Sequence, residues 1–162
     1  MLGLSTLGLI HTAISLVALV TGLILIVRDK SISPNARFGP TYLWATLLTA
    51  ATALGIFRHG GFGPPHALAI LTLAAVAIGW AGSYMRIFGR ASAYVEAVCY
   101  SATYLFHLVP GFTETLTRLP AGAPIAASDQ APILQAIDAT LLVLFLAWVG
   151  WQIWRLSRRA SR

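Results

Sequence analysis

Charged residues are scarce in this sequence, and acidic residues are the scarcer kind. Only 10% of its 162 residues are charged, with eleven lysines and arginines against five aspartates and glutamates. Hydrophobic residues make up 57% of the chain, and the mean hydropathy is +0.77. A soluble globular domain carries about 25% charged residues, so this composition excludes an ordinary water-soluble fold.

Cysteine is nearly absent as well, since Cys99 is the only one. A single cysteine cannot form a disulfide within one chain, so we expect Cys99 to be a small buried apolar side chain. Common catalytic motifs are also missing, because the sequence has no HxxxH or CxxC spacing for a metal and no nucleophile elbow. The segment GGFG lies between two apolar stretches rather than between a strand and a helix, which excludes a phosphate-binding loop.

Long apolar stretches, in contrast, are abundant. A helix needs about 20 apolar residues to cross a bilayer, and stretches of that order with at most one charged residue recur five times. They predict membrane spans at about 4–27, 40–57, 66–86, 92–112 and 132–154. We therefore expect an all-α membrane protein, in which residues 1–162 form a single bundle of five transmembrane helices.

The basic residues predict the orientation of this bundle. If the chain crosses five times, Arg58 and Arg118 fall on one side of the membrane and the nine other basic residues on the opposite side. These nine are Arg28, Lys30, Arg37, Arg86, Arg90, Arg155, Arg158, Arg159 and Arg162. Basic residues are enriched in cytoplasmic loops, so we expect an external N-terminus, a cytoplasmic C-terminus and a multi-pass location in the inner cell membrane. The net charge of +6 thus reflects contact with a lipid bilayer and does not indicate a nucleic acid partner.

The predicted span 92–112 carries a polar stripe. Steps of three or four residues lead from Glu96 through Tyr100 and Thr103 to His107, which places all four on one helical face. Lipid cannot satisfy such a stripe, so it must face other protein. We therefore expect the other helices to pack around this one.

Imidazoles and a carboxylate gather in the outer half of the predicted bundle, at His11, His66, His107 and Asp138. These groups are the usual ligands of zinc and copper, and paired histidines ligate haem iron. If their helices are neighbours, the four residues predict a site for a transition metal ion or a b-type haem, in a redox or accessory role. His66 lies closer to water, and His59 lies in the outer turn. The alternative is that a histidine at headgroup level, or one paired with a carboxylate, is merely satisfied there.

Glu96 is the one acid in the inner half of the bundle. It is a candidate proton carrier that relays through Tyr100 and Thr103 toward His107. The alternative is an ion pair with Arg86 or Arg90 at the inner surface, or a carboxyl group that burial keeps protonated. The threonines of the second span, Thr46, Thr49 and Thr52, can bond their own backbone, so we expect them to need no other partner.

Two further functions stay open beside a metal or haem protein. The chain is suited to a structural or assembly subunit without chemistry, because small residues four apart in the first three spans allow close packing with other membrane subunits or with a second copy of itself. The polar stripe instead suits a small proton or solute carrier.

Several segments resemble a known family. They are RFGPTY at 37–42, GGFGPPHALAILTL at 60–73 and SATYLFHLVPGFTETLTRLP at 101–120. Together with His11, these segments are similar to an uncharacterised family of small bacterial predicted membrane proteins, grouped as a domain of unknown function. The resemblance covers about residues 7–120 and implies the fold and the membrane location but no activity. Members often have a histidine before the arginine-glycine-tyrosine segment, where this chain has Asn35.

Overall fold

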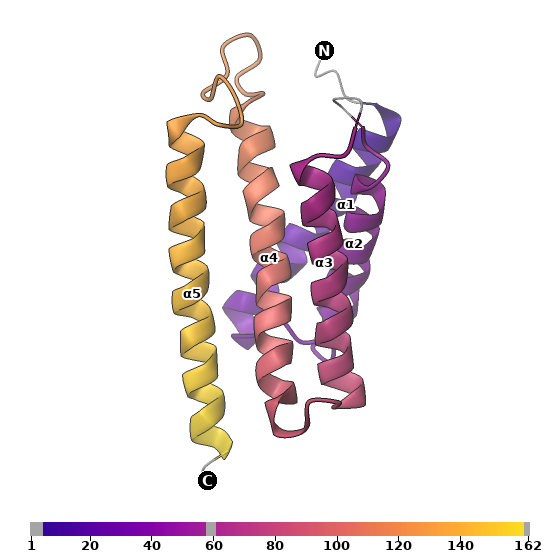
Figure 1. Ribbon diagram of the computed structural model, residues 1–162, viewed down its shortest axis with the longest axis vertical. Helices are drawn as coiled ribbons and strands as arrows, with labels where there is room; N and C mark the ends of the chain where they lie inside the picture. The colour runs from indigo at the N-terminus through magenta and orange to yellow at the C-terminus, as the bar shows by residue number, and fades with distance from the viewer. Residues whose placement is uncertain (1–4, 58–60, 161–162) are drawn as a thin grey trace.

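The computed structural model describes residues 5–57 and 61–160, and within these ranges all regular structure is helical (Figure 1). The five α-helices are α1 (Thr6–Ile24), α2 (Gly39–Ala53), α3 (Pro64–Trp80), α4 (Ser92–Leu116) and α5 (Pro132–Ala160). Their positions match the five predicted segments, so the all-α prediction is confirmed.

Two of these helices end in wider turns. α1 runs on into a π-helical turn, Leu25–Asp29, and α3 into another, Ala81–Met85. Each is terminated by a basic residue in the left-handed conformation, Lys30 with φ 57° and Arg86 with φ 50°. A short 3₁₀ turn, Gly89–Ala91, then leads into α4.

Three helical segments are long and apolar enough to cross a membrane, which indicates a membrane protein. They are Thr6–Asp29, Pro64–Met85 and Pro132–Arg159. α2 has 15 residues, which corresponds to about 22 Å, less than the roughly 30 Å of a bilayer core. It is shorter than the predicted span 40–57, because the chain leaves the helix at the turn around Gly55.

α4 is longer than predicted. The sequence suggests a helix end at Pro110 and Gly111, yet α4 continues to Leu116 with Pro110 inside it. A proline inside a helix removes one backbone hydrogen bond without necessarily ending the helix. In this last part Thr113 and Thr115 each donate a hydroxyl to the carbonyl four residues earlier, at 3.0 and 2.7 Å, as helical threonines commonly do.

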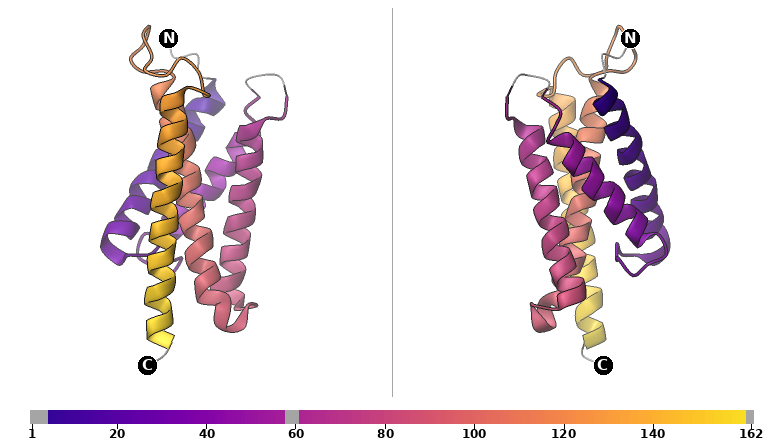
Figure 2. Two further views of the ribbon diagram at one scale, coloured as in Figure 1. Left: turned by 60° about the vertical axis from the view of Figure 1, so that its left-hand side comes forward. Right: turned by 90° about the vertical axis from the view of Figure 1, so that its right-hand side faces the viewer.

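α4 is the centre of the bundle. It packs against α1, α3 and α5, and side-chain hydrogen bonds link it to α2. This confirms the expectation that the helix with the polar stripe organises the others. α1 and α2 form a hairpin that lies at an angle to α3, α4 and α5 (Figure 2), while α5 packs chiefly on α4.

Glycines make room for tyrosine rings at two helix contacts. A Cβ added at Gly22 of α1 would lie 2.6 Å from the ring of Tyr104, and one at Gly79 of α3 would lie 2.7 Å from the ring of Tyr100. Small residues here therefore let a large side chain of α4 fit against the neighbouring helix.

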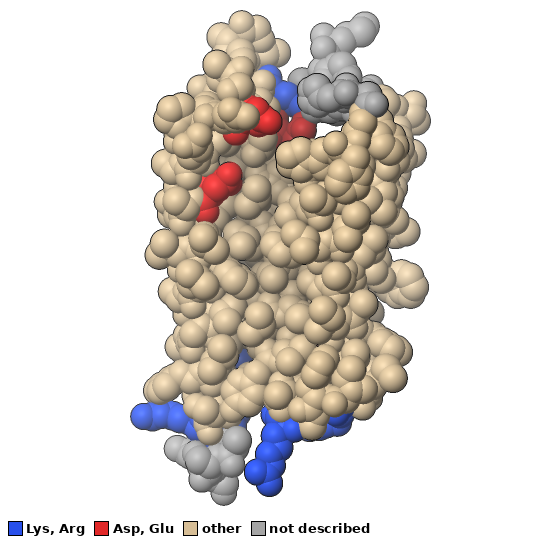
Figure 3. Space-filling model, viewed as in Figure 1, with Lys and Arg blue, Asp and Glu red and all other residues tan. Residues whose placement is uncertain are grey.

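The charges separate along the bundle. In the view of Figure 3, most of the lysine and arginine lies at the end where α5 terminates, while aspartate and glutamate lie toward the opposite end, beside one further basic patch. α1 begins and α5 terminates at opposite ends, as an odd number of crossings requires (Figure 1).

Candidate functional site

A buried polar layer joins α1, α2 and α4. It consists of His11 of α1, Tyr42, Thr46, Thr49 and Thr52 of α2, and Thr103 and His107 of α4. Tyr42, Thr46 and Thr103 are fully buried, and His107 is 6% exposed. Buried polar groups must be paired, so the partners of each imidazole define what this layer can do.

His11 is held through one ring nitrogen. Its Nδ1 lies 3.1 Å from the carbonyl oxygen of Thr49 and 3.0 Å from the hydroxyl oxygen of Thr52. A carbonyl only accepts, so Nδ1 carries the proton and the neutral ring keeps its lone pair on Nε2. The Thr52 hydroxyl donates to the carbonyl of Leu48 at 2.8 Å, which leaves its oxygen free to accept from His11. Nε2 has no hydrogen-bond partner among the described residues.

His107 is held in a related way. Its Nε2 lies 3.0 Å from the Thr46 hydroxyl, and the edge of its ring faces Tyr42 with centroids 6.3 Å apart. The Thr103 hydroxyl donates to the carbonyl of Tyr100 at 2.8 Å. The Tyr42 hydroxyl, 2.7 Å from that of Thr103, is therefore the donor in their bond. Within the described part of the chain, Nδ1 of His107 has no hydrogen-bond partner.

The two imidazoles lie on adjacent helices, since α1 packs against α4. Both rings bond to threonines of α2, His11 to Thr49 and Thr52 and His107 to Thr46. Glu114 forms an ion pair with Arg118, which lies just beyond the end of α4. These helices thus contain two imidazoles, each with one nitrogen that has no hydrogen-bond partner among the described residues.

His66 lies elsewhere and has a structural role. Its Nδ1 accepts a hydrogen bond from the backbone N–H of Gly63 at 3.2 Å and so caps the start of α3. Its ring packs against Phe57 and Phe62, with centroids 4.6 and 5.3 Å away. Because Nδ1 accepts, the proton of the neutral ring is on Nε2, which is buried without a partner. Metal binding through Nε2 would therefore require the other tautomer and the loss of the cap.

Asp138 lies on α5 and has a buried Oδ1 without a hydrogen-bond partner among the described residues. Across residues 5–57 and 61–160, no group of three or more histidine, cysteine, aspartate or glutamate side chains is arranged to hold a metal ion. Of the four predicted ligands, His11 and His107 both bond to α2, whereas His66 lies at the start of α3 and Asp138 on α5. The fourth histidine, His59, lies outside the described residues.

The side chains of the predicted proton relay form hydrogen bonds to other elements. Ser33 donates its hydroxyl to Oε1 of Glu96 at 2.8 Å, toward the connection between α1 and α2. The hydroxyl of Tyr100 instead lies 3.5 Å from Ser83 at the end of α3, while Thr103 bonds Tyr42 of α2. In the described ranges no hydrogen bond joins Glu96 to Tyr100 or links the hydroxyls of Tyr100 and Thr103.

The ion pair expected as the alternative role of Glu96 is likewise absent from the described residues. Neither Arg86 nor Arg90 forms a salt bridge with Glu96, whose hydrogen-bond partner is the hydroxyl of Ser33. The carboxylate is thus paired with a neutral group from the connection between α1 and α2.

Sequence reasoning missed the α2 side of the layer. The sequence predicts that Thr46 bonds only its own backbone, but its hydroxyl bonds His107. The hydroxyl oxygen of Thr52 accepts a hydrogen bond from His11. One signal was available for Glu114, which lies seven residues after His107 and so on the same face of the helix.

The chain was compared with protein-family models, with curated proteins and with solved structures, and none of the three comparisons gives a match.

Proposed function

We propose that this protein is a five-span protein of the inner cell membrane that binds a transition metal ion at His11 and His107, near its outer face. The observation that carries this proposal is the way the two rings are held. Each imidazole is anchored to α2 through one nitrogen and leaves the other unengaged. A metal-binding histidine typically has this arrangement, because the hydrogen bond of one nitrogen fixes the ring and directs the other toward the ion.

The ligand types favour a borderline ion such as zinc, copper or iron, since imidazole suits these metals. Two imidazoles supply two ligands, and the carboxylate of Glu114 is a candidate for a third because it lies on the same face of α4 as His107. A b-type haem ligated by the same two imidazoles is the other occupant that these residues allow. Absorption spectra distinguish them, because only the haem gives a Soret band.

The test is the metal content of detergent-purified protein after loading with zinc or copper and removal of the excess. We expect about one ion per chain, and at least a tenfold loss of affinity in His11→Ala and in His107→Ala, because each removes one of the few ligands. His66→Ala is the matched control, since it also deletes a buried imidazole but leaves the pair intact. Wild-type protein that stays free of metal, or an equal loss in the His66 variant, would contradict the proposal.

The five-span topology rests on the charge distribution, because the basic residues gather at one end of the bundle (Figure 3). The cytoplasm is the compartment that retains basic loops, which is why we assign that end to it. We also propose that the chain belongs to the uncharacterised family of small bacterial membrane proteins that its sequence resembles.

An assembly role is the second candidate, and α5 is the observation that favours it. This helix packs chiefly on α4 and exposes Leu142, Val143, Leu144 and Leu146. Full tolerance of alanine at His11 and His107 together with co-purification of a larger complex would favour this role over metal binding. A proton carrier has less support, because the polar side chains of the α4 stripe form hydrogen bonds to three different elements.

A further inference from the structure

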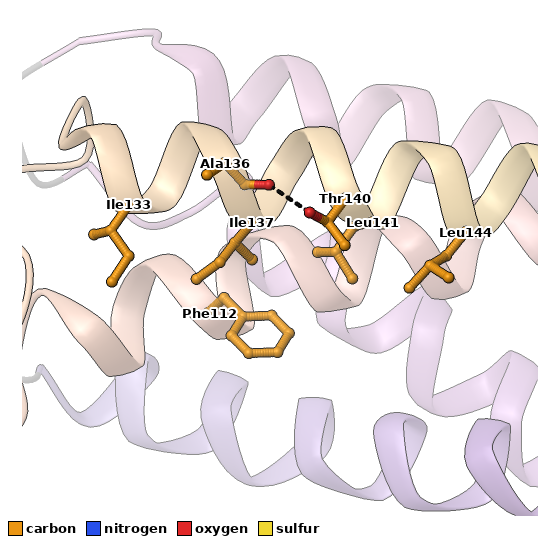
Figure 4. A pocket seen from close by; sticks show the side chains of 7 residues that line it. All are labelled: Phe112, Ile133, Ala136, Ile137, Thr140, Leu141 and Leu144. Atoms are coloured by element: carbon orange, nitrogen blue, oxygen red, sulfur yellow. Dashed lines mark hydrogen bonds between the residues drawn. The ribbon is translucent and has the colours of Figure 1, made fainter.

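One face of α5 combines an apolar groove with hydrogen-bond donors that lack a partner. The groove has a volume of about 370 Å³ and lies between α5 and Phe112 of α4 (Figure 4). Its α5 side is lined by Ile133, Ala136, Ile137, Thr140, Leu141 and Leu144. Thr140 donates its hydroxyl to the carbonyl of Ala136 at 2.7 Å. The groove therefore offers chiefly hydrocarbon contacts.

The same face continues toward the basic end of the bundle. Steps of three or four residues lead from Leu144 through Trp148 and Trp151 to Arg155, so these side chains follow one side of α5. Nε1 of Trp148 and Nε of Arg155 are both buried, and neither has an acceptor among the described residues. A buried N–H without an acceptor is costly. Two of them on one face therefore indicate an acceptor that is not part of the described chain.

Arg155 also lacks a carboxylate partner within the described ranges. Its Nη2 donates to the backbone carbonyl of Lys30 at 3.1 Å, and its guanidinium lies 4.8 Å from the ring centroid of Trp151. The charge that acts on it is that of Arg159, a second cation. Arginine binds phosphate through directed N–H bonds, so this uncompensated site suits a phosphate group.

We propose that this face of α5 binds one anionic phospholipid. Its phosphate lies at Arg155, an ester carbonyl accepts from the N–H of Trp148, and an acyl chain runs along the face into the groove. The helix between Arg155 and Leu144 is about 16 Å long at 1.5 Å per residue. One leaflet of a bilayer core is about 15 Å deep. A chain that starts at a headgroup beside Arg155 and crosses its leaflet therefore reaches the groove at Leu144.

The groove selects a lipid over a free phosphate, because only a lipid has a chain that reaches it from Arg155. The position also suits a lipid, since tryptophan and arginine are the residues that anchor helices at the membrane interface. α5 packs chiefly on α4, and Leu144 and Trp151 of this face are exposed.

The test is native mass spectrometry of the delipidated full-length protein in detergent. Phosphatidylglycerol, phosphatidylcholine and inorganic phosphate are added separately. We expect one phosphatidylglycerol to bind, at least tenfold more tightly than phosphatidylcholine, and inorganic phosphate not to compete with it. Equal binding of the two lipids, or displacement of phosphatidylglycerol by inorganic phosphate, would overturn the proposal.

Three variants locate the site. Arg155→Lys keeps the charge but loses the Nε–H and the planar fork, so we expect about tenfold weaker phosphatidylglycerol binding, with a smaller loss in Trp148→Phe. Arg90→Gln is the control, because it removes a positive charge from the same end of the bundle at a place remote in sequence from α5. An equal loss in the control would show general electrostatic attraction, and unchanged binding in Arg155→Lys would likewise refute a site at Arg155.

Discussion

At the scale of single residues, the buried layer depends on which hydroxyls are shared and which are not. Thr72 of α3 and Thr46 of α2 are both buried threonines, 6% and 0% exposed. Thr72 donates to the carbonyl of Leu68 in its own helix at 2.8 Å. Thr46 instead faces Nε2 of His107 across two helices. Chemically identical side chains thus have different roles, which depend on what lies opposite them.

This contrast leads to a matched pair of substitutions. Thr46→Val keeps the shape but leaves the Nε2 of His107 buried without a partner, which we expect to destabilise the protein by about 1–3 kcal/mol. Thr72→Val removes only a bond within one helix turn, so its effect should be well under 1 kcal/mol. Unfolding of the detergent-solubilised variants, followed by circular dichroism, measures both effects. Similar stabilities would mean that the bond between Thr46 and His107 contributes little.

The same contrast explains which roles of single residues can be predicted from the sequence. His11 and His107 stand out as histidines in apolar segments, and the expected layer contains both. The role of Thr46 is not predictable, because a helical threonine can always bond the carbonyl four residues earlier. Only the position of α2 relative to α4 shows that Thr46 has another partner.

At the scale of elements, the interface between α3 and α4 contains one closely packed contact, between a glycine and a tyrosine ring. The ring of Tyr100 packs over Gly79, and Tyr100 is fully buried. Tyr100 lies on the same face of α4 as Thr103 and His107, which Tyr42 and Thr46 of α2 hold further along the helix. This face of α4 is thus fixed by α3 at one level and by α2 at the next.

We expect Gly79→Ala to disturb this contact. The added Cβ would lie 2.7 Å from the ring of Tyr100, closer than real Cβ atoms approach. Overpacking of this kind costs about 1–3 kcal/mol. Gly150→Ala on α5 is the control, because a Cβ there meets nothing within 4 Å, and alanine stabilises a helix interior by up to about 1 kcal/mol relative to glycine. Thermal unfolding should separate the two variants in opposite directions, and an unaffected Gly79 variant would contradict the closely packed contact.

Element ends are less predictable from sequence than the elements themselves. Apolar length locates all five helices, because each must contain a long run of apolar residues. The continuation of α4 beyond Pro110 and the early end of α2 depend on local bonds, such as the threonine hydroxyls of the last turns of α4. A hydropathy pattern contains no information about these bonds.

At the scale of the whole molecule, the depth of a residue along the bundle and its angular position around the bundle have different origins. The depth of a residue follows from its distance along a helix, at about 1.5 Å per residue, so the sequence indicates that His11, His107 and Asp138 are in the outer half. Their angular positions depend on which helices are neighbours. Asp138 lies on α5, which packs chiefly on α4, whereas His11 faces α2. The sequence therefore predicts a common level in the bundle, but it does not reveal which ligands share a site.

The orientation of the molecule is a property of its charge as a whole, and it can be tested directly. In a Cys99→Ser background, Ala121→Cys introduces a thiol in the exposed connection between α4 and α5, and Ala91→Cys introduces one in the exposed turn before α4. We expect a membrane-impermeant maleimide to label the first in intact cells and the second only after the membrane is opened, because basic loops remain in the cytoplasm. The two sites differ by one crossing of α4, so each serves as the control for the other. Labelling of the Ala91 variant in intact cells would reverse the orientation and move the paired imidazoles to the cytoplasmic half.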